Sequence, residues 1–199
     1  MDTVCLSEAQ LDALRELGNI GAGNAVTSLS AFTGRLVTLA VPEVQLAPLN
    51  TVAFLLGPPE TMVAGVFLEV RGAIDGQILL VLPVDAACQF GRMLLGDIGA
   101  EESLALSAVA ESGNILAGAY LGAIEQLTGL SAQPSVPAVA IDMAGALLSS
   151  IVAQQGEMAE EALVINACFM DAGEELKGHF LLLPTPDALQ RLLAALCLA

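Results

Sequence analysis

The residues with the clearest chemical potential are a glutamate and an asparagine that lie three positions apart, and this pair occurs twice. Glu16 and Asn19 form the first pair, and Glu111 and Asn114 form the second. On a helix, side chains three residues apart point the same way. A carboxamide accepts and donates hydrogen bonds, so it can orient a water molecule without becoming charged. A carboxylate can pair with a cation on a partner. Each pair is therefore a candidate catalytic site.

Further residues recur around both pairs at the same spacing. Each glutamate follows a short polar residue by four positions, and each asparagine precedes a glycine and, further on, a proline. These supporting positions are Asp12, Gly23 and Pro42 in the first copy and Ser107, Gly118 and Pro137 in the second. We expect the polar residues to support the site, and the glycines either to allow close approach or to permit tight packing. The prolines are expected to shape the chain rather than to take part in chemistry.

The first pair lies in a predicted amphipathic helix over residues 7–34. Ser7 and Gln10 are typical of a capping box, and Gly34 suits the residue that ends a helix. Apolar residues recur at helical spacing on the side opposite the pair, namely Leu11, Leu14, Gly18, Ala22, Ala25, Leu29 and Phe32. In isolation, Glu16 and Asn19 would be read as ordinary solvated residues, but their repetition favours a functional role.

The second half of the chain repeats the plan of the first. Residues 107–129 match residues 12–34, and a predicted strand pair with a following helix occurs in both halves. We therefore predict an α+β fold in one domain, made of repeat 1 (about 1–97) and repeat 2 (about 103–199). A pseudo-twofold axis is expected between the repeats, because paired antiparallel sheets would otherwise leave exposed edges.

The second repeat is longer than the first near residues 143–161. Residues 143–153 carry no charge and are predicted to be helical. Such a run is usually core, but an element added to one copy of a symmetric fold has no symmetry-related slot to fill. We therefore expect it at the surface as a docking helix, with Asp142, Leu147 and Ile151 as partner-binding residues.

Charge and composition exclude several classes of function. The formal net charge is −16, and the six basic residues are scattered, which argues against binding nucleic acid or an anionic membrane surface. The chain has no signal-peptide pattern and no apolar run near the roughly 20 residues that a membrane-spanning helix needs. A cytoplasmic location is expected. The one histidine and four cysteines lack metal-ligand spacing, so no metal is expected on this chain.

The repeated pattern Asp/Ser-x3-Glu-x2-Asn-x22-Pro, with the flanks ELGNIGAGNA and ESGNILAGAY, resembles the CheC–CheX–FliY family of prokaryotic chemotaxis phosphatases. The resemblance covers nearly the full chain. Two motifs, and no switch-binding domain after residue 199, make the chain most similar to stand-alone CheC-type members. The resemblance implies a phosphatase that acts on the phospho-aspartate of a CheY-like response regulator, with Glu16, Asn19, Glu111 and Asn114 at its two sites.

The resemblance also bears on cofactors and partners. It implies that Mg²⁺ and a lysine are supplied by the response regulator, which agrees with the lack of a basic cluster near either motif. The receptor deamidase CheD is implied as a candidate partner for residues 143–153. The alternative hypothesis is a non-catalytic or weakly catalytic docking module that binds CheD.

Overall fold

The computed structural model describes most of the chain, namely residues 7–34, 36–48, 51–52, 57–96, 101–154, 161–171 and 174–196. Helix α1 (Glu8–Thr33) begins with the predicted capping box, in which the Ser7 and Gln10 backbone N–H groups donate to each other's side chains at 2.8 and 3.2 Å. Gly34 ends the helix in the left-handed conformation, at a φ of 65°. Both predicted ends of the helix are confirmed.

The remaining elements follow the predicted order in two similar halves. The first half continues with β1 (Thr38–Pro48), β2 (Met62–Gly72), β3 (Gly76–Pro83) and α3 (Val84–Leu95). The second half contains α4 (Glu102–Thr128), β4 (Ala132–Pro134), β5 (Ala138–Met143), α5 (Ala144–Gln154), β6 (Glu161–Asp171), β7 (Glu174–Pro184) and α6 (Pro186–Leu196). The strand predicted over residues 135–142 is shorter than expected, and the separate strand β4 precedes it.

The strands form one antiparallel sheet in the order β1-β6-β7-β3-β2, and β4 and β5 both pair with β2 at the far edge. The central pair, β3 and β7, joins the two halves. On either side of it the halves exchange strands, because β1 pairs with β6 and β5 pairs with β2. The order is therefore the same from either edge, as the predicted pseudo-twofold axis requires, and the α+β fold class is confirmed.

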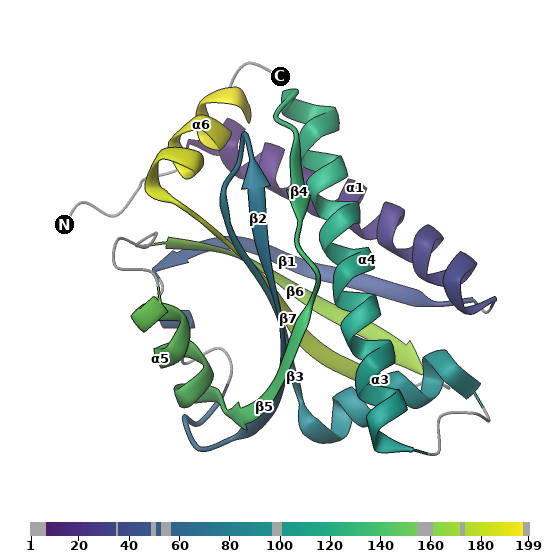
Figure 1. Cartoon of the computed structure of the whole chain (residues 1–199). Coiled ribbons are helices and arrows are strands. Elements are labelled where there is room, and N and C mark those ends of the chain that lie inside the picture. The colour runs from purple at the N-terminus through teal and green to yellow at the C-terminus, as the bar shows by residue number, and fades with distance from the viewer. Residues whose placement is uncertain are drawn as a thin grey trace.

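Helices cover the two faces of the sheet unequally. Helices α1, α3, α4 and α6 pack on one face, and α5 lies on the other (Figure 1). Alternation along the strands supplies both cores: in β2, Ala64, Val66 and Leu68 point to the four-helix side, whereas Val63 points to the α5 side. A strand buried on both faces explains the near-continuous apolar runs of the central strands.

The position of α5 corrects one expectation from the sequence. Leu147 is only 4% exposed and packs with Val63, Leu79 and Leu181 in the second core. The expectation that this part of residues 143–153 lies at the surface is therefore wrong. The second face of the sheet is itself apolar, and α5 covers it together with Val52, a fully buried residue of the helical residues 51–52 in the first half. The side chain of Ile151 lies outside the described residues.

Two glycines allow the long helices to pack closely. A Cβ atom added to Gly21 of α1 would overlap Cδ1 of Tyr120 of α4, whose ring stacks on Phe180 with centroids 4.8 Å apart. A Cβ atom added to Gly113 of α4 would lie 2.8 Å from Cγ1 of Val66 in β2. At both positions a larger residue would force its neighbour to shift, so Gly21 and Gly113 set how closely α1 and α4 sit on each other and on the sheet.

Helix α4 is long and apolar enough to cross a membrane by length and composition alone, over Ser103–Thr128. In the structure, however, 56% of its most apolar window is buried inside the protein. Its apolar residues, including Val109, Leu116 and Ile124, belong to the main core. The composition of α4 is thus that of a core helix.

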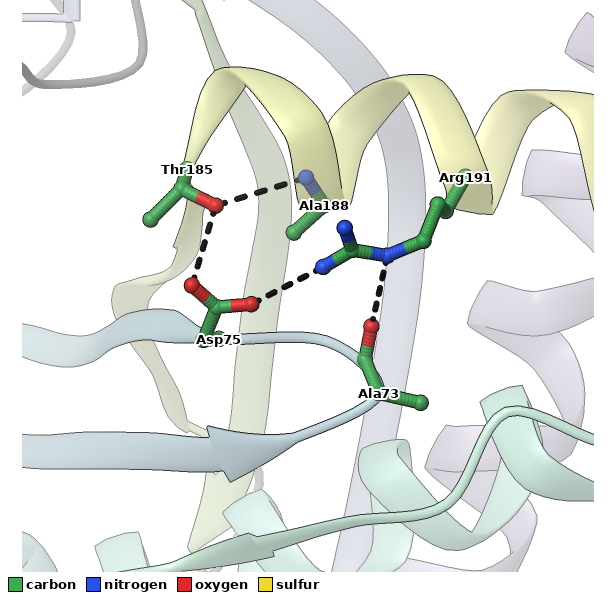
Figure 2. A network of polar contacts seen from close by, with 5 residues as sticks. All are labelled: Ala73, Asp75, Thr185, Ala188 and Arg191. Atoms are coloured by element: carbon green, nitrogen blue, oxygen red, sulfur yellow. Dashed lines mark hydrogen bonds and ion pairs between the residues drawn. The ribbon is translucent and has the colours of Figure 1, made fainter.

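A polar network ties the first half of the chain to the last helix (Figure 2). Arg191 of α6 donates to the Ala73 carbonyl oxygen at 3.0 Å and pairs with Asp75 at 2.9 Å. The Thr185 hydroxyl donates to the other oxygen of Asp75 at 3.2 Å and accepts from the Ala188 N–H group at 3.3 Å, which caps α6. The turn between β2 and β3 is therefore held by the second half of the chain.

The close contact at Gly21 gives a first prediction. The Gly21→Ala substitution should lower the free energy of unfolding by about 1–3 kcal/mol, because the new methyl group must displace the Tyr120 ring. Urea titration followed by circular dichroism measures this change. In a Tyr120→Ala background the added cost of Gly21→Ala should disappear, and an equal cost in both backgrounds would contradict the proposed contact.

Candidate active site

The first motif lies on the outward side of α1. Its four helical positions are all exposed, namely Asp12, Glu16, Asn19 and Gly23. The opposite side of the helix is buried and includes Leu14, Gly18 and Ala25. The predicted apolar stripe is confirmed over most of its length, although Phe32 near its end is more than half exposed. The carboxylate and the carboxamide are therefore held toward solvent by packing on the other side of the helix.

The second motif lies at the matching place on α4 but is more enclosed. Ser107 and Gly118 are exposed, whereas Glu111 and Asn114 are half-buried. Figure 1 shows why: β4 and β5 run along one side of α4, and α1 crosses it on the other side. The structure keeps the two motifs on separate helices, so the two pairs are two separate candidate sites.

The motif glycines differ from the packing glycines. A Cβ atom added to Gly23 or to Gly118 would meet nothing within 4 Å. Packing within the chain therefore does not require glycine at these positions, although glycine is unfavourable in the middle of a helix. One turn beyond each asparagine, the backbone is left bare on the outward side, where an approaching molecule could contact it.

The two supporting polar residues interact locally. Asp12 forms an exposed ion pair with Arg15 at 2.9 Å, and the Ser107 hydroxyl donates to the Ser103 carbonyl oxygen at 2.9 Å. Each contact lies within a single helix. Asp12 is charged and pairs with a side chain, whereas Ser107 is neutral and donates to a backbone carbonyl oxygen. A supporting role for Asp12 and Ser107 stays a prediction.

The two motif prolines occupy corresponding breaks in the edge strands. Pro42 lies in β1 between Ala40 and Glu43, where two residues of β1 stand opposite one residue of β6. Pro137 lies in the segment between β4 and β5. Proline cannot donate to a strand ladder and is therefore tolerated at bulges and sheet edges. The positions of both prolines suit a role in shaping the chain.

A groove of about 740 Å³ lies on the α5 side of the sheet, away from both motifs. Asp142 and Leu147 are among its lining residues, together with Phe67, Gln77 and Ser150. Asp142 also accepts a hydrogen bond from the Met143 N–H group at 2.8 Å. None of the Glu and Asn motif residues lines this groove. The partner-binding role of Asp142, Leu147 and Ile151 stays a prediction.

The described residues contain no group of three or more His, Cys, Asp and Glu side chains that could hold a metal ion. The one histidine, His179, lies on the α5 side of the sheet with Nδ1 2.9 Å from Oδ1 of Asn166. Burial lowers the pKa of His179, which favours its neutral form. These contacts are those of a structural histidine within the sheet.

The fold and the two sites define a class of duplicated α+β domains that present one Glu–Asn pair on each of two crossing helices. A model of the CheC-like family matches residues 10–46 and 104–141, which hold both motifs. The CheY-P phosphatase CheC of Bacillus subtilis (strain 168) is 36% identical over 200 residues, covering 96% of this chain and 95% of that protein. The chain belongs to the CheC-like family.

Solved structures agree on the fold. The crystal structure of Thermotoga maritima FliY matches with a TM-score of 0.74 at 22% identity, over 98% of both chains. The CheX–CheY–BeF3–Mg²⁺ complex of Borrelia burgdorferi includes a chain that matches with a TM-score of 0.50 at 15% identity, over 85% of this chain and 97% of that one. At these identities the matches concern the fold alone.

The sequence analysis missed one feature beside the second motif. Strand β5 carries apolar side chains at alternate positions, Val139, Ile141 and Met143, and all three are exposed. The period of two along residues 138–143 was the signal that could have revealed an apolar row on one face of a strand.

The open surroundings of the motif glycines give a second prediction. Gly23→Ala and Gly118→Ala should each raise the free energy of unfolding by about 0.5–1 kcal/mol, because alanine is the better helix former and its methyl group meets no atom. Gly122→Ala, at another open position in α4, calibrates this gain. Destabilisation by either motif variant, measured by urea titration, would show that its glycine serves packing after all.

Proposed function

We propose that this chain hydrolyses the aspartyl phosphate of a CheY-like response regulator at two sites, one on α1 and one on α4. The observation that carries the proposal is the repeated pair, Glu16 with Asn19 and Glu111 with Asn114, on outward helix sides whose inward sides are locked by packing. The relative named CheY-P phosphatase supports the same substrate class, because it matches nearly the whole chain.

The role proposed for the asparagine follows from the chemistry of an acyl phosphate. In-line attack by water breaks the bond between phosphorus and the aspartyl oxygen and yields a free carboxylate and inorganic phosphate. Asn19 or Asn114 would accept a hydrogen bond from the attacking water through Oδ1, and Nδ2 would remain a donor toward the phosphoryl oxygens. Fixing the water in line is a gain in orientation, which needs no change of charge on the enzyme.

The role proposed for the glutamate is docking. Glu16 is exposed, and Glu111 is half-buried, so either can reach a cation on an approaching protein. Four ion pairs join basic residues in the described part of the chain to nearby acidic residues, involving Arg15, Arg71, Lys177 and Arg191. In this proposal, the negative charge on the phosphoryl group is neutralised by a lysine and Mg²⁺ of the regulator. Bound Mg²⁺ supplies positive charge beside the phosphoryl oxygens.

The alternative, a docking module for CheD with little catalysis, receives less support. Both copies retain the glutamate and the asparagine, whereas a pure docking module would have no need for two intact pairs. The helix expected to dock CheD also buries Leu147 in the core. Binding of CheD at the remaining surface of α5 stays a prediction.

Duplication gives a test of the asparagine. Asn19→Ala and Asn114→Ala should each leave partial phosphatase activity, while the double variant should lose about 100-fold or more, because no residue then positions the water. The readout is the release of inorganic phosphate from phosphorylated CheY. Full activity in the double variant would overturn the proposed role, and complete loss in one single variant would mean that the other site is silent.

The origin of the metal can be tested separately. Hydrolysis should require Mg²⁺, yet titration calorimetry of Mg²⁺ into this protein alone should show no tight binding, because the described residues offer no ligand cluster. CheY alone serves as the matched sample and should bind the ion. A tight Mg²⁺ site on the isolated phosphatase would contradict this assignment.

A further inference from the structure

The second site has an apolar surface beside it that the chain itself does not cover. Val139, Ile141 and Met143 of β5 and Met62 of β2 are 38%, 39%, 47% and 49% exposed. Met62 pairs with Met143 in the sheet, so the four side chains form one continuous row. We call this row the β5 shelf. Four neighbouring exposed apolar side chains on one strand edge are unusual for a surface that stays in water.

The β5 shelf lies on the same face of the sheet as the motif helices. Val66 and Ala64 of β2 belong to the main core under α4, and they pair with Val139 and Ile141 of β5. Residues paired across neighbouring strands point to the same face. Gly113 of α4 sits directly on Val66, and Val139 is one strand spacing, about 4.8 Å, further out.

Asn114 is on the flank of α4 that faces the shelf. Successive helical residues are about 100° apart, so Ser112 and Asn114 lie on opposite flanks when Gly113 faces the sheet. Ser112 is completely buried, which places it on the flank covered by the neighbouring helices. Asn114 is therefore on the other flank, where β4 and β5 run beside α4 (Figure 1).

The size of a protein substrate decides what covers the shelf. A protein partner commonly buries about 800 Å² on each side, which corresponds to a patch roughly 16 Å in radius. A patch of this size centred on Asn114 extends over Val139 and Ile141, which start one strand spacing beyond the residue under Gly113. The shelf is continuous with the flank of α4 that carries Asn114. We therefore assign the receiver domain as the molecule that covers the shelf.

The flanking edge strand of the first site is β1, where Leu39 is 9% exposed and belongs to the core and Leu46 is half-buried. Just before this strand Leu36 is 89% exposed, and Phe32 near the end of α1 is 52% exposed. The side chains of residues 41–44 of β1 lie outside the described residues. Glu16 and Asn19 are more exposed than Glu111 and Asn114. The two copies of the motif thus differ in how far their Glu and Asn side chains are enclosed.

We propose that the β5 shelf is an apolar docking surface for the phosphorylated receiver domain at the second site. The inference rests on the proposed function. The shelf would contribute equally to binding of the substrate and of the transition state, so it would lower KM with little effect on kcat. Asn114 would remain the group that touches the reacting atoms.

The test isolates each site with an asparagine variant. In an Asn19→Ala background, where only the second site hydrolyses, Ile141→Glu should raise KM for phosphorylated CheY about tenfold or more and change kcat less than twofold. In an Asn114→Ala background the same change should alter KM less than twofold. Val136→Glu adds the same charge at an 88% exposed position that faces the groove on the other side of the sheet, and it should leave both backgrounds unchanged.

Several results would overturn the proposal. These are an unchanged KM in the Asn19→Ala background, an equal rise in both backgrounds, or a loss of kcat without a change in KM. If Ile141→Glu fails to fold, Ile141→Thr and Val139→Thr provide the same comparison, because threonine suits a strand and removes apolar surface. Smaller rises in KM, still confined to the second site, are then expected.

A binding measurement separates this proposal from the proposed function. In titrations with CheY loaded with beryllofluoride and Mg²⁺, Ile141→Glu should weaken binding at one of the two sites of this protein and leave the other unchanged. This result requires no hydrolysis. If neither asparagine background hydrolyses phosphorylated CheY, the proposed function fails, while an unchanged binding curve for Ile141→Glu means that the shelf proposal fails.

Discussion

A helix packed on a sheet can hold a row of polar side chains in a fixed direction only if it cannot rotate about its own axis. In this chain that constraint comes from two close contacts, Gly21 against the Tyr120 ring and Gly113 against Val66. Each brings backbone nearer to its neighbour than any larger residue would permit. The directions of Asn19 and Asn114 are thus set by close packing on other sides of their helices, and the motif residues need no contacts of their own to stay in place.

Local signals in the sequence were enough to predict the elements and the candidate sites. The capping box of Ser7 and Gln10, the left-handed Gly34 and the repeated spacing of the motif each depend on neighbours within a few residues. The pairing of β1 with β6 depends on segments more than a hundred residues apart, and no short pattern encodes it. Leu147 was misplaced for a related reason, since the apolar second face of the sheet that buries it becomes evident only when the strands are assembled.

Duplication has preserved the chemical groups more strictly than their surroundings. The edge strand is one bulged strand beside α1, but it is divided into β4 and β5 beside α4. The segment between β5 and β6, which holds α5, is longer than the segment between β1 and β2, and Asp12 and Ser107 differ in charge. Two sites that share the Glu–Asn pair but differ in the residues around it can have different affinities for one substrate. They can then respond to different substrate concentrations, which a single site or two identical sites cannot do.

The exchange of strands between the halves has a consequence for chain connectivity. Each half completes its sheet with a strand of the other, and the network around Asp75 and Arg191 adds a further tie between them. The covalent connection from α3 to α4 is one of many links, and α6 contacts α1 at the symmetry-related place. A rearranged gene in which the second repeat precedes the first would therefore specify the same strand neighbours. The pairing of the strands therefore does not depend on which of the two repeats comes first in the chain.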